Sequence, residues 1–208
     1  MDVPIRLAIT LFSGFLQKLG SPGSGMVRLE HEAYQKCCGR PDVRVRLFPW
    51  SVDASDVAES LWRCRPDDAP QVHLVAGYSY GGDRAVKFVR QLALRGDVDV
   101  RGLWLCDGVR RLDWLWGVAA ATGLGYLEVP ALVGHCTYFV QRNPRWAIGR
   151  EGGLFQPAGH PVVIAKNAET TLRGPIVKTV GHSYMDDDSQ FRREFLSDLD
   201  RLLTEQVQ

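Results

Sequence analysis

No apolar run in the 208-residue chain approaches the roughly 18 residues that a membrane-spanning helix needs. The N-terminus, MDVPIRLAITLF, lacks the basic segment and small-residue cleavage site of a secretory signal peptide. The 25 Lys and Arg nearly balance the 24 Asp and Glu, giving a net charge of +1. That balance gives no reason to expect a nucleic acid or an anionic membrane as the main partner.

Cysteines are few, and their spacing excludes the common cysteine motifs. The chain has five, an odd number, without a C-x-x-C pair, and adjacent Cys37 and Cys38 are poorly spaced for metal ligation. Cys106 and Cys136 lie in apolar, strand-like runs, where small buried hydrophobic residues are common. The sequence therefore predicts reduced, buried thiols in a cytoplasmic protein, with no metal site and no cofactor.

The composition, 45% hydrophobic and 24% charged, is that of a globular protein, and residues 1–208 are predicted to form one domain with a sizeable core. Short strand candidates alternate with helical patterns along the whole chain. This alternation predicts an α/β fold: a mostly parallel central sheet with helices on both faces. Strands are expected at residues 5–11, 43–48, 72–76, 103–106, 136–140 and 176–180, and helices at 26–38, 53–64, 80–94 and after an N-cap at Asp188 or Ser189.

One motif carries most of the chemical information. Residues 77–81, Gly-Tyr-Ser-Tyr-Gly, follow an apolar strand candidate and precede a helical pattern. G-x-S-x-G in that context is typical of a nucleophile elbow, a turn so sharp that the serine is strained and its hydroxyl exposed above the sheet. The glycines are needed because a Cβ at Gly77 or Gly81 would clash where strand and helix approach. Ser79 is therefore the candidate nucleophile; the alternative is an ordinary Gly-rich turn.

A serine hydroxyl needs a neighbouring base, and the chain offers five histidines. His31, His73 and His135 fall within or at the start of predicted elements. His160 is on a loop but precedes further apolar sequence, whereas His182 comes just after the last strand. Because active sites of open parallel sheets form at the carboxyl ends of strands, His182 is the predicted base, with a capping or surface histidine as the alternative.

Residues 181–185, Gly-His-Ser-Tyr-Met, resemble a second elbow but end in Met185 where the closing glycine should be. An acidic tract, residues 186–188, follows in place of a helix that could pack on a sheet. Ser183 is therefore interpreted as a bystander, and His182 as the residue of interest.

The acid that orients the base should also follow a strand. Asp107 ends the strand after the elbow strand, where a carboxylate is costly unless it is hydrogen-bonded, and orienting His182 would satisfy it. Asp107 is the predicted acid, although it could simply form a turn with Gly108. Glu151, in the loop after the next strand, is the second candidate, and Asp113 is the third.

An oxyanion intermediate needs backbone N–H donors. Tyr80, directly after the nucleophile, is predicted to supply one. The loop after the first strand, residues 13–15, should supply the other; Phe15 is the candidate, with Gly14 or Phe12 as alternatives.

Substrate contacts are expected from Tyr78, Trp114 and Trp116. Residues 114–132 are apolar and longer than a crossover needs; they are interpreted as a buried helix, the alternative being a substrate-facing flap. Five arginines near predicted strand ends could bind an anionic substrate, although a solvated face explains them more simply; they are Arg110, Arg111, Arg142, Arg145 and Arg150.

These features together resemble the α/β-hydrolase superfamily, in a compact form with little or no lid. The resemblance rests on the elbow at residues 77–81, the order Ser79, Asp107, His182, and the loop at residues 13–15. The segment from His182 to Asp186 is also similar to one found in small bacterial and phage hydrolases of this fold. The loop lacks the family's common His-Gly pair, and many members place the acid one strand later, which keeps Glu151 a candidate.

The resemblance implies a serine hydrolase that cleaves small-molecule carboxylic esters through an acyl-enzyme with a Ser-His-Asp triad. A thioesterase or amidase would use the same triad. A non-catalytic binding module on the same fold is the alternative from another class.

Overall fold

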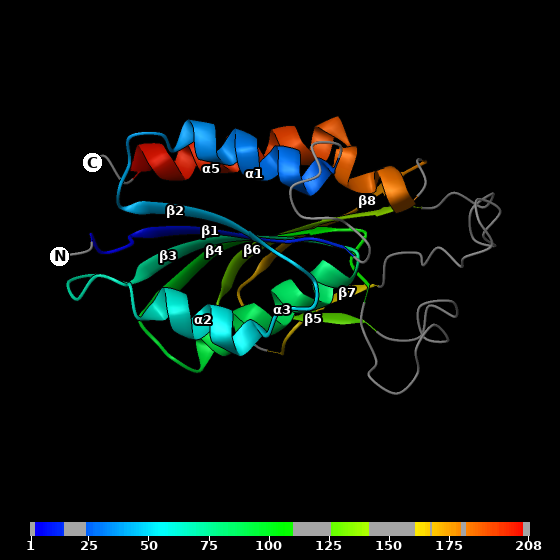
Figure 1. Ribbon diagram of the computed structural model, residues 1–208. Helices are drawn as coiled ribbons and strands as arrows, with labels where there is room; N and C mark the ends of the chain where they lie inside the picture. The colour runs from blue at the N-terminus through cyan, green and yellow to red at the C-terminus, as the bar shows by residue number, and fades with distance from the viewer. Residues whose placement is uncertain are drawn as a thin grey trace.

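Six parallel strands form the central sheet of the computed structural model, which describes residues 3–14, 24–109, 126–141, 161–166, 168–179 and 182–205. The strand order across the sheet is β2-β1-β3-β4-β6-β8. The carboxyl ends of all six strands therefore lie on the same side of the molecule, on the right in Figure 1; we call this the carboxyl edge of the sheet. The strands are β1 Leu7–Phe12, β2 Val43–Phe48, β3 Gln71–Tyr78, β4 Val98–Cys106, β6 Val133–Gln141 and β8 Thr171–Lys178.

Within the described residues, two helices cover each face of the sheet (Figure 1). α1 (Gly25–Lys36) and α5 (Ser189–Glu205) lie on one face, and α2 (Ala54–Trp62) and α3 (Tyr80–Ala93) lie on the other. A short 3-10 helix, η1 (His182–Asp187), connects β8 to α5. The predicted α/β class with a parallel sheet between two helical layers is thus confirmed. No helix in these described ranges has the length and apolar character to cross a membrane.

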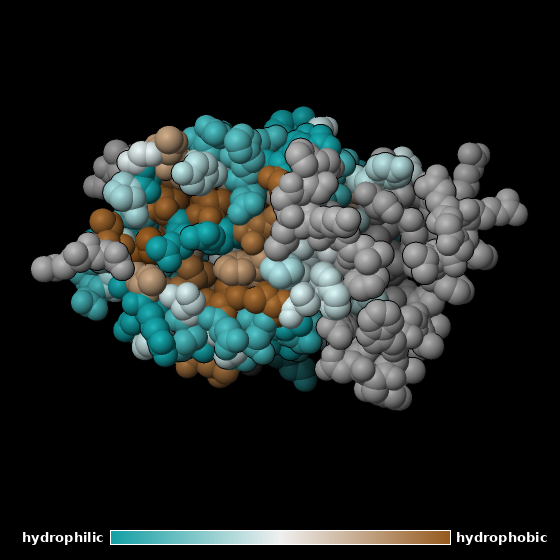
Figure 2. Space-filling model, in the orientation of Figure 1, coloured by the Kyte–Doolittle hydropathy of each residue, from teal (hydrophilic) through white to brown (hydrophobic). Residues whose placement is uncertain are grey.

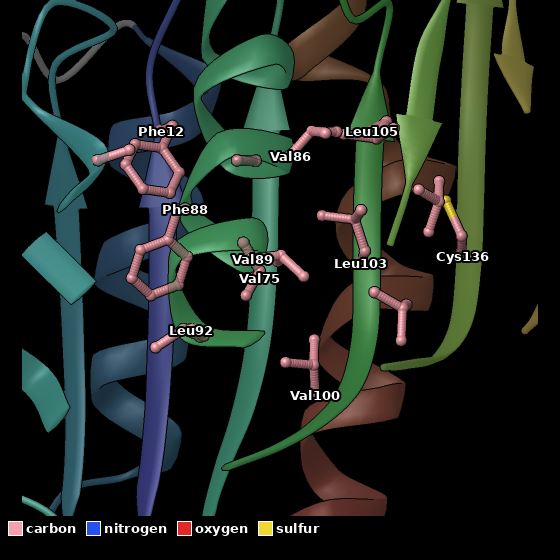
Figure 3. Close-up of a cluster of buried hydrophobic side chains, with 14 of the residues drawn as sticks. Phe12, Val75, Val86, Phe88, Val89, Leu92, Val100, Leu103, Leu105 and Cys136 are labelled. Atoms are coloured by element: carbon pink, nitrogen blue, oxygen red, sulfur yellow. The ribbon is translucent and has the colours of Figure 1, made fainter. Parts of the chain in front are cut away.

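Each strand contributes to two cores because its side chains alternate between the faces. In β1, Phe12 packs with α2 and α3, whereas Ile9 and Leu11 pack with α1 and α5. Figure 3 shows the first core, where side chains of α3 such as Phe88 and Val89 lie against β1, β3 and β4. Burial on both faces explains why an inner strand such as β1 reads as a nearly continuous apolar run.

Two short strands were not predicted. β5 (Leu127–Val129) and β7 (Val162–Ile164) pair in parallel as a separate two-stranded sheet. The expectation of a helix at residues 114–132 is therefore wrong at its C-terminal end, where β5 forms. Residues 114–125 lie outside the described part of the chain. A three-residue strand has too few positions for a periodic pattern to reveal it.

Strand β8 begins at Thr171, five residues before the predicted start, and continues through Gly174 and Pro175. These two residues stand opposite the single residue Tyr138 of β6, because the register shifts between Thr137 and Phe139. Such a bulge accommodates the pair, and β8 is an edge strand, where a missing N–H is tolerated.

The opposite edge of the sheet is β2. Figure 2, in the orientation of Figure 1, shows apolar residues between the two helical layers on this side, interrupted by hydrophilic ones. Val43, Val45 and Leu47 are partly buried against the core on the face of the sheet that α1 and α5 cover. The N–H of Leu47 donates to the Glu30 carboxylate at 2.9 Å, so a side chain of α1 occupies one edge donor.

His73 in β3 makes folding sensitive to acid. Its side chain is fully buried beside Phe88, and burial lowers its pKa from 6.5 to about 3. Protonation therefore favours the unfolded state, so its contribution to stability is complete above pH 6.5 and is lost progressively toward pH 3. Between pH 7.5 and pH 5 we expect the protein to lose about 2 kcal/mol more unfolding free energy than His73→Leu, measured by urea denaturation. Equal losses in the two proteins would contradict this expectation.

Candidate active site

Ser79 follows the last residue of β3 and has φ 54° and ψ −125°, a conformation that strongly favours glycine. A non-glycine residue there carries strain of about 1–3 kcal/mol, which the surrounding contacts must overcome. The Ser79 carbonyl accepts hydrogen bonds from the N–H groups of Gly82 (2.9 Å) and Val109 (2.8 Å). Its own N–H donates to the carbonyl of Cys106 at 3.1 Å. The strained turn predicted from the sequence is therefore present and is held from two segments, whereas the predicted exposure of the serine is not observed, because Ser79 is only 3% exposed.

The two elbow glycines are required by close approach. A Cβ on Gly77 would lie 2.3 Å from the carbonyl oxygen of Gly81, and a Cβ on Gly81 would lie 2.3 Å from that of Phe12. Both contacts are with backbone, which cannot rotate away. The predicted clash is confirmed at both positions. It arises because β1, β3 and the start of α3 are in direct contact there.

Asp107 lies beside the elbow because β3 and β4 are neighbours in register. Tyr78 pairs with Cys106, so the next residues, Ser79 and Asp107, emerge side by side at the carboxyl edge. The Asp107 carboxylate is fully buried, and its Oδ1 accepts a hydrogen bond from the N–H of Gln141 at 3.0 Å. Asp107 also has a positive φ, 48°, a conformation that aspartate tolerates better than most residues.

The loop after β1 was predicted to supply the second N–H donor for the oxyanion, and the structure describes two of its residues, Ser13 and Gly14. The N–H of Ser13 donates to the carbonyl of Phe48 at 2.9 Å and is therefore engaged. A Cβ on Gly14 would lie 2.7 Å from the Tyr78 ring and 3.0 Å from the Ser79 Cβ, so the Gly14 backbone packs closely against Tyr78 and Ser79. Phe15 lies outside the described residues. Tyr80 begins α3, which puts its N–H at a helix N-terminus next to Ser79.

His182 begins η1, four residues after the end of β8. The backbone of His182 thus follows the carboxyl end of β8. Ser79 and Asp107 follow the carboxyl ends of β3 and β4, at the same carboxyl edge of the sheet. Its side chain is outside the described part of the chain. Among the other histidines, His73 is enclosed in the core, and His135 lies 2.8 Å from the Asp198 carboxylate on the α5 face.

Several sequence candidates fall outside the described residues and stay predictions. They are Phe15, Trp114, Trp116, Asp113, Glu151, His160 and the arginines at 110, 111, 142, 145 and 150. Tyr78, the remaining substrate-binding candidate, is 4% exposed, with its ring next to Gly14. Burial, and then the negative charge of Asp186, raise the pKa of the Tyr78 phenol.

Sequence reasoning missed Trp50, in the turn that follows β2. Its ring lies 5.9 Å from that of Tyr80, centroid to centroid, at an angle of 43°. The Trp50 carbonyl accepts from the Arg84 side chain at 3.1 Å, which ties the turn to α3. Trp50 and Tyr80 therefore form an aromatic pair next to Ser79. The available signal was a tryptophan two residues after the end of β2, next to Pro49.

No group of three or more His, Cys, Asp or Glu side chains within the described ranges is arranged to hold a metal ion. Cys106 and Cys136 are fully buried, as predicted, and burial raises the pKa of both thiols. The buried carboxylate of Asp107 and the strained Ser79 lie side by side after the ends of β4 and β3.

No family model matches the chain, and no curated protein matches it. Among solved structures it is similar to the RedJ thioesterase from the prodiginine biosynthetic pathway of Streptomyces coelicolor, with 14% identity, 96% and 92% of the two chains covered and a TM-score of 0.44. It is also similar to a structure of RedJ with a PEG molecule bound in the active site, with 14% identity, 96% of this chain and 95% of that chain covered, and a TM-score of 0.47. A third similar structure is the NocB thioesterase domain in covalent complex with a fluorophosphonate nocardicin G analog. The identity is 17%, 95% of this chain and 94% of that chain are covered, and the TM-score is 0.39. The parallel sheet between helical layers, with a strained serine at the strand-to-helix turn after β3, makes the fold of this chain α/β-hydrolase-like.

Proposed function

We propose that the protein is a serine hydrolase that cleaves carboxylic esters through an acyl-enzyme. The observation that supports this most directly is the strained backbone of Ser79 beside the buried carboxylate of Asp107. Strain of this kind is retained where the surroundings enforce it, and it is concentrated at functional sites. His182 completes the set because its segment follows β8 at the same edge of the sheet.

In the proposed reaction His182 accepts the hydroxyl proton of Ser79 as the serine oxygen attacks the ester carbonyl. Backbone N–H groups of Tyr80 and of Phe15 or Gly14 stabilise the oxyanion of the tetrahedral intermediate. The intermediate collapses, and the alcohol leaves with the proton held by His182. Water then attacks the acyl-enzyme, with His182 as base, releasing the acid and restoring Ser79. Asp107 orients the imidazole and stabilises its protonated form.

The aromatic pair of Trp50 and Tyr80 provides an apolar surface next to the nucleophile. An acyl chain that packs on these rings removes apolar area from water, at about 25 cal/mol per Å². We therefore place the acyl group of the substrate on this side of Ser79; Trp114 and Trp116 stay predicted substrate contacts.

A fluorophosphonate probe and an ester panel test this proposal. The probe should label the protein once, at Ser79, and p-nitrophenyl esters of short to medium acyl chains should be hydrolysed. Acyl-CoA substrates, assayed beside the esters, measure the preference between ester and thioester. If neither labelling nor hydrolysis of any acyl substrate is found, the protein is a binding module on a hydrolase-like fold.

A further inference from the structure

The N-terminus of α1 is capped by a residue far away in the sequence. Ser24, at the N-cap position, makes no side-chain cap hydrogen bond. In its place the Oδ2 of Asp186 accepts a hydrogen bond from the N–H of Met26 at 3.1 Å. Asp186 is only 2% exposed, so its carboxylate is held inside the protein at the positive end of the α1 dipole.

This contact is accompanied by a close backbone approach. A Cβ on Gly25 would lie 2.2 Å from the carbonyl oxygen of Asp186 and 2.7 Å from the N atom of Asp187. Both are backbone atoms, so only glycine lets η1 lie this close to the start of α1. The segment that begins with His182 is therefore fixed against the helix that follows the predicted oxyanion loop.

The same segment also contacts β4, and its charge acts on a residue of β3. The thiol of Cys106, the residue before Asp107, donates to the carbonyl of Met185 at 3.2 Å. Tyr78, the residue before Ser79, lies within the electrostatic influence of Asp186. Met185 therefore attaches the His182 segment to the strand that ends before Asp107, and the charge of Asp186 acts on the residue before Ser79.

The end of η1 is fixed as well. Asp188 accepts hydrogen bonds from the N–H groups of Gln190 (2.9 Å) and Phe191 (3.0 Å), which caps α5, and it lies 3.0 Å from the Lys178 ammonium. Asp187 lies 3.0 Å from the Arg28 guanidinium. The acidic tract thus makes three separate attachments: those of Asp186 and Asp187 are both directed at α1, and only that of Asp186 is buried.

We propose that Asp186 is a positioning residue for the triad: by capping α1 it holds the His182 segment in register with Ser79 and Asp107. This inference rests on the proposed hydrolase function and adds a residue to it. Misplacement of a catalytic group by about 1 Å can cost on the order of 10²-fold in rate. Loss of the cap should therefore lower kcat far more than it changes KM.

The test compares Asp186→Ala, Asp186→Asn and Gly25→Ala with the matched control Asp53→Ala. Asp53 caps α2 by accepting from the N–H of Ser55 at 2.7 Å, so its loss removes the same kind of interaction on the other face of the sheet. We expect kcat for a p-nitrophenyl ester to fall about 10–100-fold in Asp186→Ala and in Gly25→Ala, and KM to change less than about threefold. Asp53→Ala should keep wild-type kcat. Asp186→Asn retains an acceptor for Met26 and should recover most of the rate.

The pH dependence of fluorophosphonate labelling separates positioning from a loss of folded protein. A histidine that is displaced from Asp107 loses the stabilisation of its charged form, so the acidic limb of the labelling rate should move to lower pH by about half a unit or more in Asp186→Ala. A smaller amount of folded protein lowers the amplitude and leaves that limb in place. If Asp186→Ala does not fold, the same shift is expected in Gly25→Ala.

Three results would overturn the inference. One is an unchanged kcat and labelling profile in folded Asp186→Ala or Gly25→Ala. Another is an equal fall of kcat in Asp53→Ala, and the third is an Asp186→Asn protein as slow as Asp186→Ala. Wild-type protein that the probe labels at Ser79 keeps the proposed function intact in all three cases, whereas wild-type protein that is neither labelled nor active would overturn both.

Discussion

Replacing Ser79 with alanine should lower kcat by about 10³-fold or more while leaving the folded structure unchanged. The substitution removes one oxygen at the N-terminus of α3, and the backbone hydrogen bonds that hold the elbow do not involve it. Steady-state hydrolysis of a p-nitrophenyl ester, with thermal unfolding measured on the same samples, checks both parts.

Two further variants make this result specific. Ser79→Gly should be as inactive as Ser79→Ala but more stable by about 1 kcal/mol, because glycine adopts φ 54° without a strained Cβ. Ser183→Ala, in the elbow-like segment before the acidic tract, should have nearly wild-type activity. A fully active Ser79→Ala protein, or an inactive Ser183→Ala protein, would show that the nucleophile has been assigned to the wrong serine.

His182 and Asp107 should act with Ser79 as one unit. His182→Ala is expected to cost about as much as Ser79→Ala, and the double variant only slightly more, because members of a triad are strongly non-additive. Asp107→Asn should reduce kcat by about 10²-fold or more, yet by less than the loss of the serine. Its side-chain oxygen can still accept from the N–H of Gln141, so the protein should remain folded.

Glu151 is the competing candidate for the acid of the triad. Glu151→Gln is expected to keep wild-type kcat if the acid is Asp107, which follows the strand next to the elbow strand. A nearly active Asp107→Asn protein together with a severely impaired Glu151→Gln protein would assign the acid to Glu151, which follows β6 in the sequence. The two single variants, assayed with one ester at several pH values, decide between the carboxylates.

Local patterns predicted the elements whose signals are local. Val43–Phe48 was placed correctly because apolar and basic residues alternate there and Pro49 ends the strand. The elbow was found because two glycines and a serine at fixed spacing express a steric requirement that the structure confirms. By contrast, Gly174 and Pro175 usually terminate strands, so the first half of β8 was missed; its position at an edge with a bulge depends on β6, far away in the sequence.

The same distinction applies to the site. The order of Ser79, Asp107 and His182 could be proposed from strand ends alone, whereas the contacts that hold their segments join distant parts of the chain. The acidic tract was interpreted by its composition, and nothing near it indicates that Asp186 would contact Met26. Trp50 was missed for a similar reason, since its neighbour Tyr80 lies on another element.

The cap on α1 also has a consequence for the order of events during synthesis. Met26 and Asp186 are separated by 160 residues, so on a ribosome that adds about 5–20 residues per second the helix waits roughly 10–30 s for its cap. All pairings in the main sheet are parallel and join segments separated by long crossovers, which makes assembly slow. The proposed hydrolytic activity should therefore be the last property that a nascent chain acquires, and its appearance would report that the C-terminal segment has docked.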